Sequence, residues 1–191
     1  GTYIFNSKDL CMIEHIPDMI DAGINSFKVE GRMKTALYVA VVTRTYREAI
    51  DDYYTSRELY ESKMEHYRQE IAACTFRQFT TGFYYGKPNE ETQIYDCNTY
   101  VKNRVYLGMV EDVTEAGELV LHQKNKFCVG DIVEVMAFDG ENEDVEVLSI
   151  HDEHGTEMES APHPKQLLYV KVSDSEKIRK GMIIRTRHCA A

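Results

Sequence analysis

The stretch Ile24-Asn25-Ser26-Phe27-Lys28-Val29-Glu30-Gly31-Arg32-Met33-Lys34 is the strongest indication of the fold of this chain. Its first half predicts a short buried strand, and Gly31 permits the tight turn that follows. From about Met33 onward the apolar residues recur at helical spacing. A strand that passes directly into a helix is typical of α/β proteins, in which functional residues gather at the carboxyl ends of strands.

Helical periodicity lies on both sides of this strand. Before it, Ser7 is a suitable N-cap, apolar residues recur at three- and four-residue spacing, and Gly23 supplies a stop, so we predict a helix between them. After it, we expect one helix over about 33–54 and another over about 57–74. A single strand cannot form a parallel sheet, so this helical part is expected to be the end of a larger, TIM-like α/β domain.

From about residue 75 the pattern changes to short alternating strands separated by glycine-containing turns. Six strands are expected: Tyr106–Val113, Leu119–His122, Ile132–Phe138, Val145–Ile150, Leu167–Val172 and Met182–Thr186. Strands of this number and spacing predict a small antiparallel β-barrel, so the predicted fold class is α+β. The predicted organisation is a helical domain over 1–74, a Gly- and aromatic-rich connector over 75–104, and the barrel over 105–191.

Composition limits the classes of function. The chain of 191 residues has a net charge of −10, which excludes a role for the whole molecule as a basic nucleic-acid clamp. Nine carboxylates without any Lys or Arg fall within 139–159, where a solvated hairpin or loop is expected. The five cysteines are scattered and form no Cys-x-x-Cys pair, so neither a disulfide framework nor a self-contained zinc site is expected. No apolar run reaches membrane-spanning length, no leader resembles a signal peptide, and a reducing cytoplasm is the expected location.

Charged residues gather at the predicted passage from strand to helix. Lys28 and Glu30 lie two residues apart on the strand and would share a face, with Arg32 close behind. A carboxylate between two cations stays ionised, and the cations can hold a phosphate, a carboxylate or a developing oxyanion. We therefore take Lys28, Glu30 and Arg32 as candidate catalytic residues and Lys34 as a candidate substrate contact. The alternative is a salt-bridge cluster that fixes the following helix.

Cys11 is the candidate metal-ligating residue. It would lie in the first turn of the predicted N-terminal helix, where the helix dipole lowers a thiol pKa and favours a thiolate ligand. His15, one turn further on, is a weak candidate base for a nucleophilic role. The alternative is a small buried core residue, which is the usual environment of a free cysteine.

Two further groups are candidates for substrate binding. Phe83 lies in an aromatic connector that can stack on RNA bases or, alternatively, seal a domain interface. The aromatic residues concerned are Phe83, Tyr84, Tyr85, Tyr95 and Tyr100. Lys124 and Lys126 form a basic turn between two predicted strands, which is either a solvated hairpin or an RNA contact.

Several motifs resemble the collagenase-like peptidase family U32. They are Ser7-x-Asp9-Leu10-Cys11, the block from Gly23 to Lys34, Tyr38-Val39 and Tyr46-Arg47-x-Ala49-x-Asp51. Later, Thr81-Gly82-Phe83 and Asn125-Lys126-Phe127-x-x-Gly130-Asp131 are similar to the C-terminal extension of many members. The resemblance covers nearly the whole chain, and Lys-Val-Glu-Gly-Arg is its most specific part.

The resemblance implies a parent protein with a TIM-like α/β barrel followed by a small β-barrel similar to the second domain of translation elongation factors. This chain would hold the last helices and strand of the first and all of the second. The family carries a peptidase or collagenase label, and other members are associated with hydroxylation of tRNA or rRNA bases, or of the ubiquinone ring. Those members use an iron–sulfur cluster held by four cysteines, of which Cys11 would be one. The other three ligands would lie upstream, so this chain alone is expected to hold no cluster.

Three functional hypotheses follow. The first is the C-terminal part of a U32 enzyme, inactive in isolation, whose parent hydroxylates RNA bases rather than cleaving peptides. The chain shows no His-Glu-x-x-His helix, Gly-x-Ser-x-Gly elbow or convincing Cys–His pair, but the missing part of the parent can supply a nucleophile. The second is a non-catalytic β-barrel that binds RNA or protein. The third is a structural or oligomerisation module.

The partners expected are the missing α/β barrel domain, tRNA or rRNA, and a second copy of the chain covering exposed helix faces. The distribution of the basic residues distinguishes RNA binding from a structural role, because a shared face beside the aromatic connector would support RNA. The residues to place are Lys102, Arg104, Lys124, Lys126, Lys165, Lys171, Arg185 and Arg187.

Overall fold

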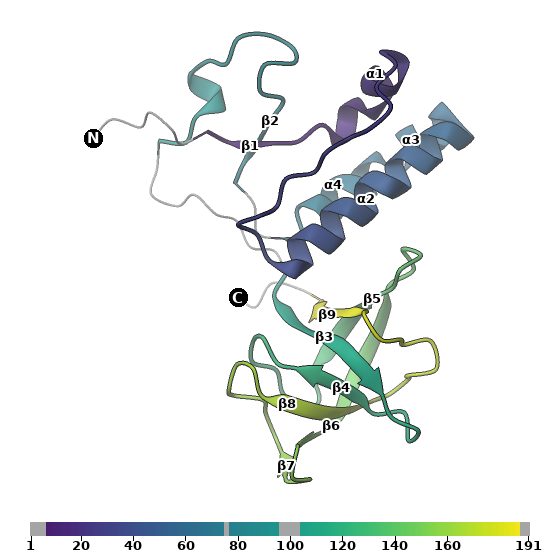
Figure 1. Ribbon diagram of the computed structural model, residues 1–191, viewed down its shortest axis with the longest axis vertical. Helices are drawn as coiled ribbons and strands as arrows, with labels where there is room; N and C mark the ends of the chain where they lie inside the picture. Colours follow the sequence, from purple (N-terminus) through teal and green to yellow (C-terminus); the bar gives the residue numbers. More distant parts are fainter. Residues whose placement is uncertain (1–6, 75–76, 96–103, 188–191) are drawn as a thin grey trace. The chain divides into compact units, whose positions relative to one another are not determined.

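The computed structural model describes residues 7–74, 77–95 and 104–187 (Figure 1). The chain divides into two compact units, Gly1–Asn103 and Arg104–Ala191, which are described here one at a time. The first is a helical unit and the second is a β-barrel unit.

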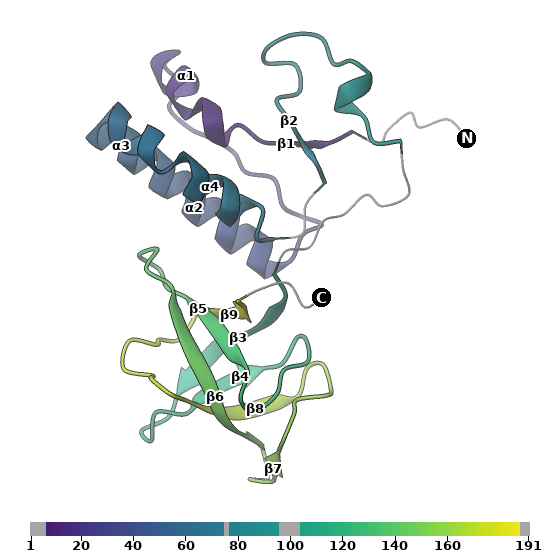
Figure 2. The same cartoon turned by 180° about the vertical axis from the view of Figure 1, so that it is seen from behind.

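The barrel unit is a closed antiparallel β-barrel, which confirms the predicted fold class. Its strands are β3 (Tyr106–Val113), β4 (Leu119–His122), β5 (Ile132–Met136), β6 (Glu143–Asp152), β8 (Leu167–Val172) and β9 (Ile183–Thr186). They follow the order β5-β9-β3-β4-β8-β6, and a pairing of β5 with β6 closes the barrel, as the view from behind also shows (Figure 2). A short strand, β7 (Glu157–Met158), pairs with β6 outside this ring and was not predicted.

Alternation of apolar residues builds the interior of the barrel. On β6, Val145, Val147 and Ile150 are buried, whereas Glu146 and Leu148 between them are exposed. Closure also requires one position without a side chain, because a Cβ at Gly108 would lie 3.0 Å from the Leu121 side chain. These features explain why the sequence pattern predicted the strands well.

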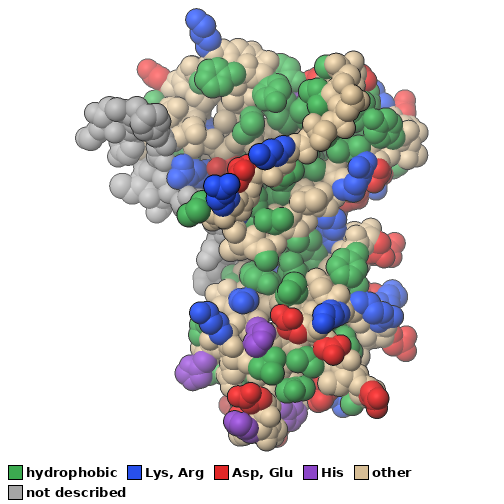
Figure 3. Space-filling view, in the orientation of Figure 1, with side chains coloured by type: hydrophobic (Ala, Val, Ile, Leu, Met, Phe, Trp, Pro, Cys, Tyr) green, Lys and Arg blue, Asp and Glu red, His purple; other side chains and the backbone are tan. Residues whose placement is uncertain are grey.

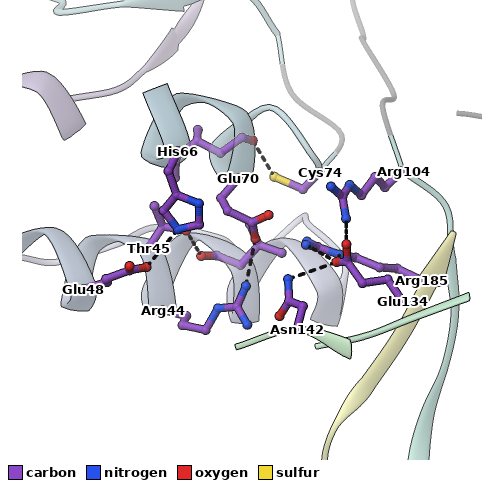
Figure 4. A network of polar contacts seen from close by, with 12 residues as sticks. Arg44, Thr45, Glu48, His66, Glu70, Cys74, Arg104, Glu134, Asn142 and Arg185 are labelled. Carbon is purple, nitrogen blue, oxygen red and sulfur yellow. Dashed lines mark hydrogen bonds and ion pairs between the residues drawn. The ribbon is translucent and has the colours of Figure 1, made fainter. Parts of the chain in front are cut away.

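Glu134 on β5 is the centre of a polar cluster within the barrel unit. Arg185 Nε donates to its carboxylate at 2.5 Å, Arg104 pairs with the same carboxylate, and the Asn142 amide donates to it at 3.0 Å (Figure 4). These contacts join Arg104, two residues before β3, to strands β5 and β9. Arg104 and Arg185 therefore have partners inside the unit.

The helical unit consists of one long helix and several short elements. They are a 3-10 turn η1 (Ile13–His15), α1 (Ile16–Asp21), α2 (Ala36–Thr55), α3 (Arg57–Ser62), α4 (Met64–Ile71) and a second 3-10 turn η2 (Glu90–Thr92). Thr35 caps α2 by accepting from the Tyr38 N–H, and Ser56 caps α3 by accepting from the Leu59 N–H. The predicted helix over 57–74 is divided in two at Lys63. None of the described helices combines the length and the apolar character that a membrane span requires.

Two predicted elements of the helical unit are wrong. The first helix does not begin at Ser7, because Asp9–Leu10 forms β1, which pairs in parallel with β2 (Phe79–Thr80). The Asp9 carboxylate bonds to groups far away in sequence rather than capping a helix, so tertiary contacts override the local pattern.

The predicted strand at 24–29 is also not formed. The backbone there belongs to no sheet in the described part of the chain, and Ile24 and Val29 are each 41% exposed. A strand requires a neighbouring strand to satisfy its backbone groups, and the described residues offer none beside this segment.

Candidate functional site

A cleft of about 480 Å³ lies in the helical unit, between β1, β2, η1 and α4. Its polar lining consists of Cys11, Glu14, His15, Arg68, Thr80 and Thr81, and its apolar lining includes Ile13, Ile71 and Phe79. The parallel β1–β2 pair places Cys11 here, because the Cys11 N–H donates to the Thr80 carbonyl at 3.0 Å.

The thiol of Cys11 is held by a tyrosine of α2. Tyr46 Oη lies 3.8 Å from Cys11 Sγ and accepts a hydrogen bond from the Met12 N–H at 2.8 Å. Burial is the main cause of a raised pKa at Cys11, and it also raises the pKa of Tyr46. The prediction that a helix terminus lowers the thiol pKa is therefore wrong, since Cys11 follows a strand. A neutral, desolvated thiol is a poor nucleophile.

His15 does not act on Cys11 in this arrangement. Its ring centroid lies 4.5 Å from that of Tyr85, and its Nδ1 lies 3.4 Å from a carboxylate oxygen of Asp18. Tyr85 also donates a hydrogen bond to Asp18, and this bond raises the pKa of Tyr85 to about 12. Among the described residues, the side chain that hydrogen-bonds the Cys11 thiol is Tyr46 and not His15, and the Ile13 backbone also bonds to the thiol.

The opposite wall of the cleft contains a bidentate ion pair. Arg68 on α4 donates to both carboxylate oxygens of Glu14, at 2.7 and 2.9 Å, and this pairing lowers the pKa of Glu14. The pair connects η1 to α4. It places one negative and one positive group in the lining of the cleft, while the side-chain hydrogen bond of the thiol is made to Tyr46.

Asp9 and Lys34 join the two motifs that first suggested a site. Lys34 Nζ donates to Asp9 Oδ2 at 3.0 Å and lies 5.0 Å from the centroid of the Tyr38 ring. The Arg77 N–H donates to the same carboxylate oxygen at 3.0 Å. Burial raises the pKa of Tyr38 to about 12. Lys34, predicted as a substrate contact, thus lies against the residues that precede Cys11.

Sequence reasoning missed the roles of Asp9, Tyr38 and Tyr46. Asp9 falls in the first turn of the predicted N-terminal helix, although its partners are 25 and 68 residues away. The two tyrosines belong to the motifs already noted, and their spacing of eight residues on α2 places both toward the same side of a helix. That spacing was the available signal.

Lys28, Glu30 and Arg32 lie exposed on the extended segment before α2. Figure 3 shows basic and acidic side chains along this segment. Glu30 Oε1 accepts a hydrogen bond from the Arg32 N–H at 2.9 Å, which shapes the turn. In the described part of the chain these three side chains form no ion pair with one another, so the salt-bridge cluster considered above is absent there.

The remaining predicted site residues do not line the cleft that contains Cys11. Phe83 is 81% exposed in a turn of the helical unit. Lys124 and Lys126 are exposed in a loop of the barrel unit, and Tyr100 and Lys102 lie outside the described residues.

The described residues alone do not fit a metal centre. No group of three or more described His, Cys, Asp or Glu side chains could hold a metal ion. Cys74 donates to the Ile71 carbonyl at 3.1 Å, Cys128 belongs to the barrel unit, and Cys97 and Cys189 lie outside the described residues. An iron–sulfur cluster takes four thiolates, and this cleft offers the single thiol of Cys11.

Comparisons with known proteins agree with the motifs. The family model described as peptidase family U32 matches residues 1–94, and the model of the U32 C-terminal domain matches residues 102–185. The chain is 36% identical over 184 residues to tRNA hydroxylation protein P1 of Bacillus subtilis, covering 94% of this chain and 43% of that protein. It is 29% identical to tRNA hydroxylation protein P of Escherichia coli, covering 97% of this chain and 40% of that protein.

A protein named collagenase from Porphyromonas gingivalis is also similar, at 36% identity over 61% of this chain and 35% of that protein. Among solved structures, the C-terminal domain of a U32 peptidase of Geobacillus thermoleovorans is 30% identical, with a TM-score of 0.39 over 43% of this chain and 99% of that one. The chain thus spans well under half the length of the curated relatives named here.

Proposed function

The chain belongs to peptidase family U32, and from this membership we propose that the longer protein to which it corresponds hydroxylates tRNA. The observation that carries the proposal is the extent of the match: relatives named tRNA hydroxylation proteins align with 94% and 97% of this chain. Among the described residues the Cys11 thiol is hydrogen-bonded to a tyrosine and to no histidine, which is further support because it is poor machinery for peptide cleavage.

In this proposal the helical unit forms one wall of the catalytic centre. Lys28 and Arg32 hold phosphates of the tRNA backbone, since exposed cations without an ion pair bind phosphate readily. Glu30 fixes the turn between them through the Arg32 N–H. Asp9 and Lys34 hold the segment before α2 beside the strand that carries Cys11. Phe83, being exposed, is available to stack on a base.

The cofactor we propose for the longer protein is an iron–sulfur cluster, to which Cys11 contributes one ligand. The other ligands would come from parts of the protein outside this chain. The chain alone is then expected to be inactive and to hold no cluster. We place the reaction in the cytoplasm because a tRNA substrate is found there.

Complementation tests this function directly. The full-length protein is expressed in cells that lack their own tRNA hydroxylation proteins, and tRNA nucleosides are analysed by mass spectrometry. We expect a nucleoside heavier by one oxygen atom. Cys11→Ser removes it, whereas Cys128→Ser, a matched change in the barrel unit, leaves it unchanged. Failure of the unaltered protein to restore the nucleoside contradicts the proposal.

Proteolysis is the second candidate, and the similarity to a protein named collagenase favours it. The test is hydrolysis of gelatin and casein by the full-length protein. If Glu30→Ala or Cys11→Ser abolishes such hydrolysis while tRNA nucleosides are unaffected by the intact protein, proteolysis replaces hydroxylation as the function.

A further inference from the structure

Two loops of the barrel unit carry lysines and no carboxylate, although the chain as a whole is acidic. Residues 119–130 and 160–173 contain four lysines, two histidines and no carboxylate, although the chain holds 32 Asp and Glu. The first range includes the loop between β4 and β5, and the second includes the loop that leads into β8. These two segments are separated by about thirty residues of acidic sequence. A third stretch without carboxylates, 177–187, holds five Lys and Arg, of which Lys177, Arg185 and Arg187 pair with carboxylates of the unit.

The fold brings these two loops side by side. The Gln123 N–H donates to the Gln166 carbonyl at 3.0 Å, and the Lys165 N–H donates to the Gln123 carbonyl at 2.7 Å. Figures 1 and 2 show the two loops next to each other at the same end of the barrel. Lys124, Lys126 and Lys165 lie on them, and we call this surface the lysine loops.

The lysine loops are fixed from inside the barrel. Gln123 is fully buried, and its side-chain amide donates to the Ala161 carbonyl and, at 3.1 Å, to the Asn125 carbonyl. The Asn125 amide donates to the Tyr106 carbonyl at 2.7 Å. Surface loops are usually mobile, and these contacts order the backbone that carries the three lysines before any ligand binds.

The backbone of Lys165 carries a further sign of function. Its φ of 72° places it in the left-handed region, and it is the one such residue other than glycine in the described part of the chain. A side chain in this region is strained relative to the right-handed region, and glycine would avoid that strain. Strained positions of this kind cluster at binding sites.

Four other basic residues of the barrel unit have carboxylate partners, whereas Lys171 and Lys180 have none among the described residues. Arg104 and Arg185 share Glu134, Arg187 pairs with Asp144 at 2.9 Å, and Lys177 pairs with Glu143 at 2.8 Å. In the described structure the exposed amines of Lys124, Lys126 and Lys165 have no carboxylate partner. Figure 3 shows Lys, Arg and His side chains together at the edge of this unit.

We propose that the lysine loops bind the phosphate backbone of RNA. The inference deepens the proposed function, on which it rests, by assigning a substrate-binding surface to the barrel unit. Several exposed amines on an ordered backbone, without carboxylate partners among the described residues, give phosphate contacts that position RNA without reading its sequence. Each contact releases counterions, so binding is expected to weaken steeply with salt.

The test measures binding of an unmodified tRNA transcript to the full chain by fluorescence anisotropy at several salt concentrations. The variant carries Lys124→Gln, Lys126→Gln and Lys165→Gln. We expect affinity to fall about tenfold or more at low salt, and the slope of log K against log salt to decrease by about 2, as three lost phosphate contacts require. The control carries Lys171→Gln, Lys177→Gln and Lys180→Gln, which removes the same charge elsewhere in the unit, and should change affinity by less than about threefold.

Each other outcome overturns the proposal. Equal weakening by both variants indicates non-specific attraction, and unchanged or absent tRNA binding shows that the loops bind no RNA. If the lysine-loop variant loses binding to polyglutamate but not to tRNA, the partner is an acidic protein. Thermal unfolding of each variant verifies folding.

Failure of this inference is distinguishable from failure of the proposed function. Binding is measured without hydroxylation, so a loss of affinity in the lysine-loop variant stands even if complementation fails. Conversely, full-length protein with altered lysine loops that hydroxylates and binds tRNA as before would retain the function and refute the surface.

Discussion

The barrel unit and the helical unit differ in how far their own strands satisfy the hydrogen-bonding groups of their backbones. Each of the six ring strands of the barrel pairs with two neighbours, and their inward side chains form one continuous core. The described part of the helical unit has a sheet of two short strands, and its segment 24–34 belongs to no sheet although it carries the most specific motif. The ring strands of the barrel find all their partners within the unit, whereas the segment 24–34, part of the catalytic wall that we propose, has no strand partner among the described residues.

This difference matters for function because a catalytic wall needs rigid support on both sides. Tyr46, Asp9 and Lys34 fix the position of Cys11 from within the unit. Lys28, Glu30 and Arg32 have no comparable support from packing, and we propose that they obtain it in the longer protein.

Separating the units gives the largest expected effect. Expressed alone, residues 104–191 should unfold in one cooperative transition, because a closed barrel contains its own core and leaves no open edge. Residues 1–103 alone should lack such a transition. Circular dichroism with urea and hydrogen exchange measure both. A cooperative helical fragment would show that its fold needs no further structure.

The next test truncates one buried isoleucine side chain in the core of each unit. Ile150 in the barrel and Ile16 in the helical unit are both 0% exposed. Ile150→Ala should lower the free energy of unfolding of the barrel by about 2–5 kcal/mol, through lost burial and a residual cavity. Ile16→Ala should leave barrel stability unchanged. Hydrogen exchange resolved by peptide separates the units, and loss of barrel protection in Ile16→Ala would show that they unfold together.

The same contrast explains what could be predicted from sequence. The strands of the barrel follow from local alternation and turn glycines, because neighbours in the ring are supplied by the chain itself. The element at 24–29 was predicted as a strand from a pattern that depends on partners the described residues do not offer. The Asp9 and Tyr46 contacts could not be read from local spacing, since each joins residues more than twenty positions apart. Lys124 and Lys126 were recognised as a basic turn, but the adjacency of Lys165 depends on the backbone hydrogen bonds of Gln123.

Alkaline pH should lower the stability of the helical unit more than that of the barrel unit. The expected loss per residue is smaller than that of the core deletions. Burial raises the pKa of Tyr60 in the helical unit from 10.0 to about 12. A pKa raised in the folded state stabilises the fold below the unfolded value and loses that contribution as pH rises from about 10 through about 12. The loss for Tyr60 is on the order of 2 kcal/mol.

The helical circular dichroism signal should therefore decrease in this pH window, while strand protection in the barrel persists. Tyr60→Phe is the control, because it removes the titrating group together with the hydrogen bond to the Ile13 carbonyl. It should lower stability at neutral pH and flatten the alkaline decrease. An unchanged pH profile in this variant would assign the transition to other groups.

The smallest expected effect tests whether the left-handed backbone at Lys165 lowers the stability of the barrel unit in favour of RNA binding. Lys165→Gly relieves the left-handed backbone, and after the entropy cost of glycine the barrel should gain about 0.5–1 kcal/mol in urea unfolding. The same change removes one amine from the lysine loops, so tRNA affinity should fall by about threefold while stability rises. Lys126→Gly is the matched control, since it removes a charge without relieving strain and should not stabilise. A variant at Lys165 that gains stability and keeps its full affinity would mean that the strained backbone there serves the fold and not the ligand.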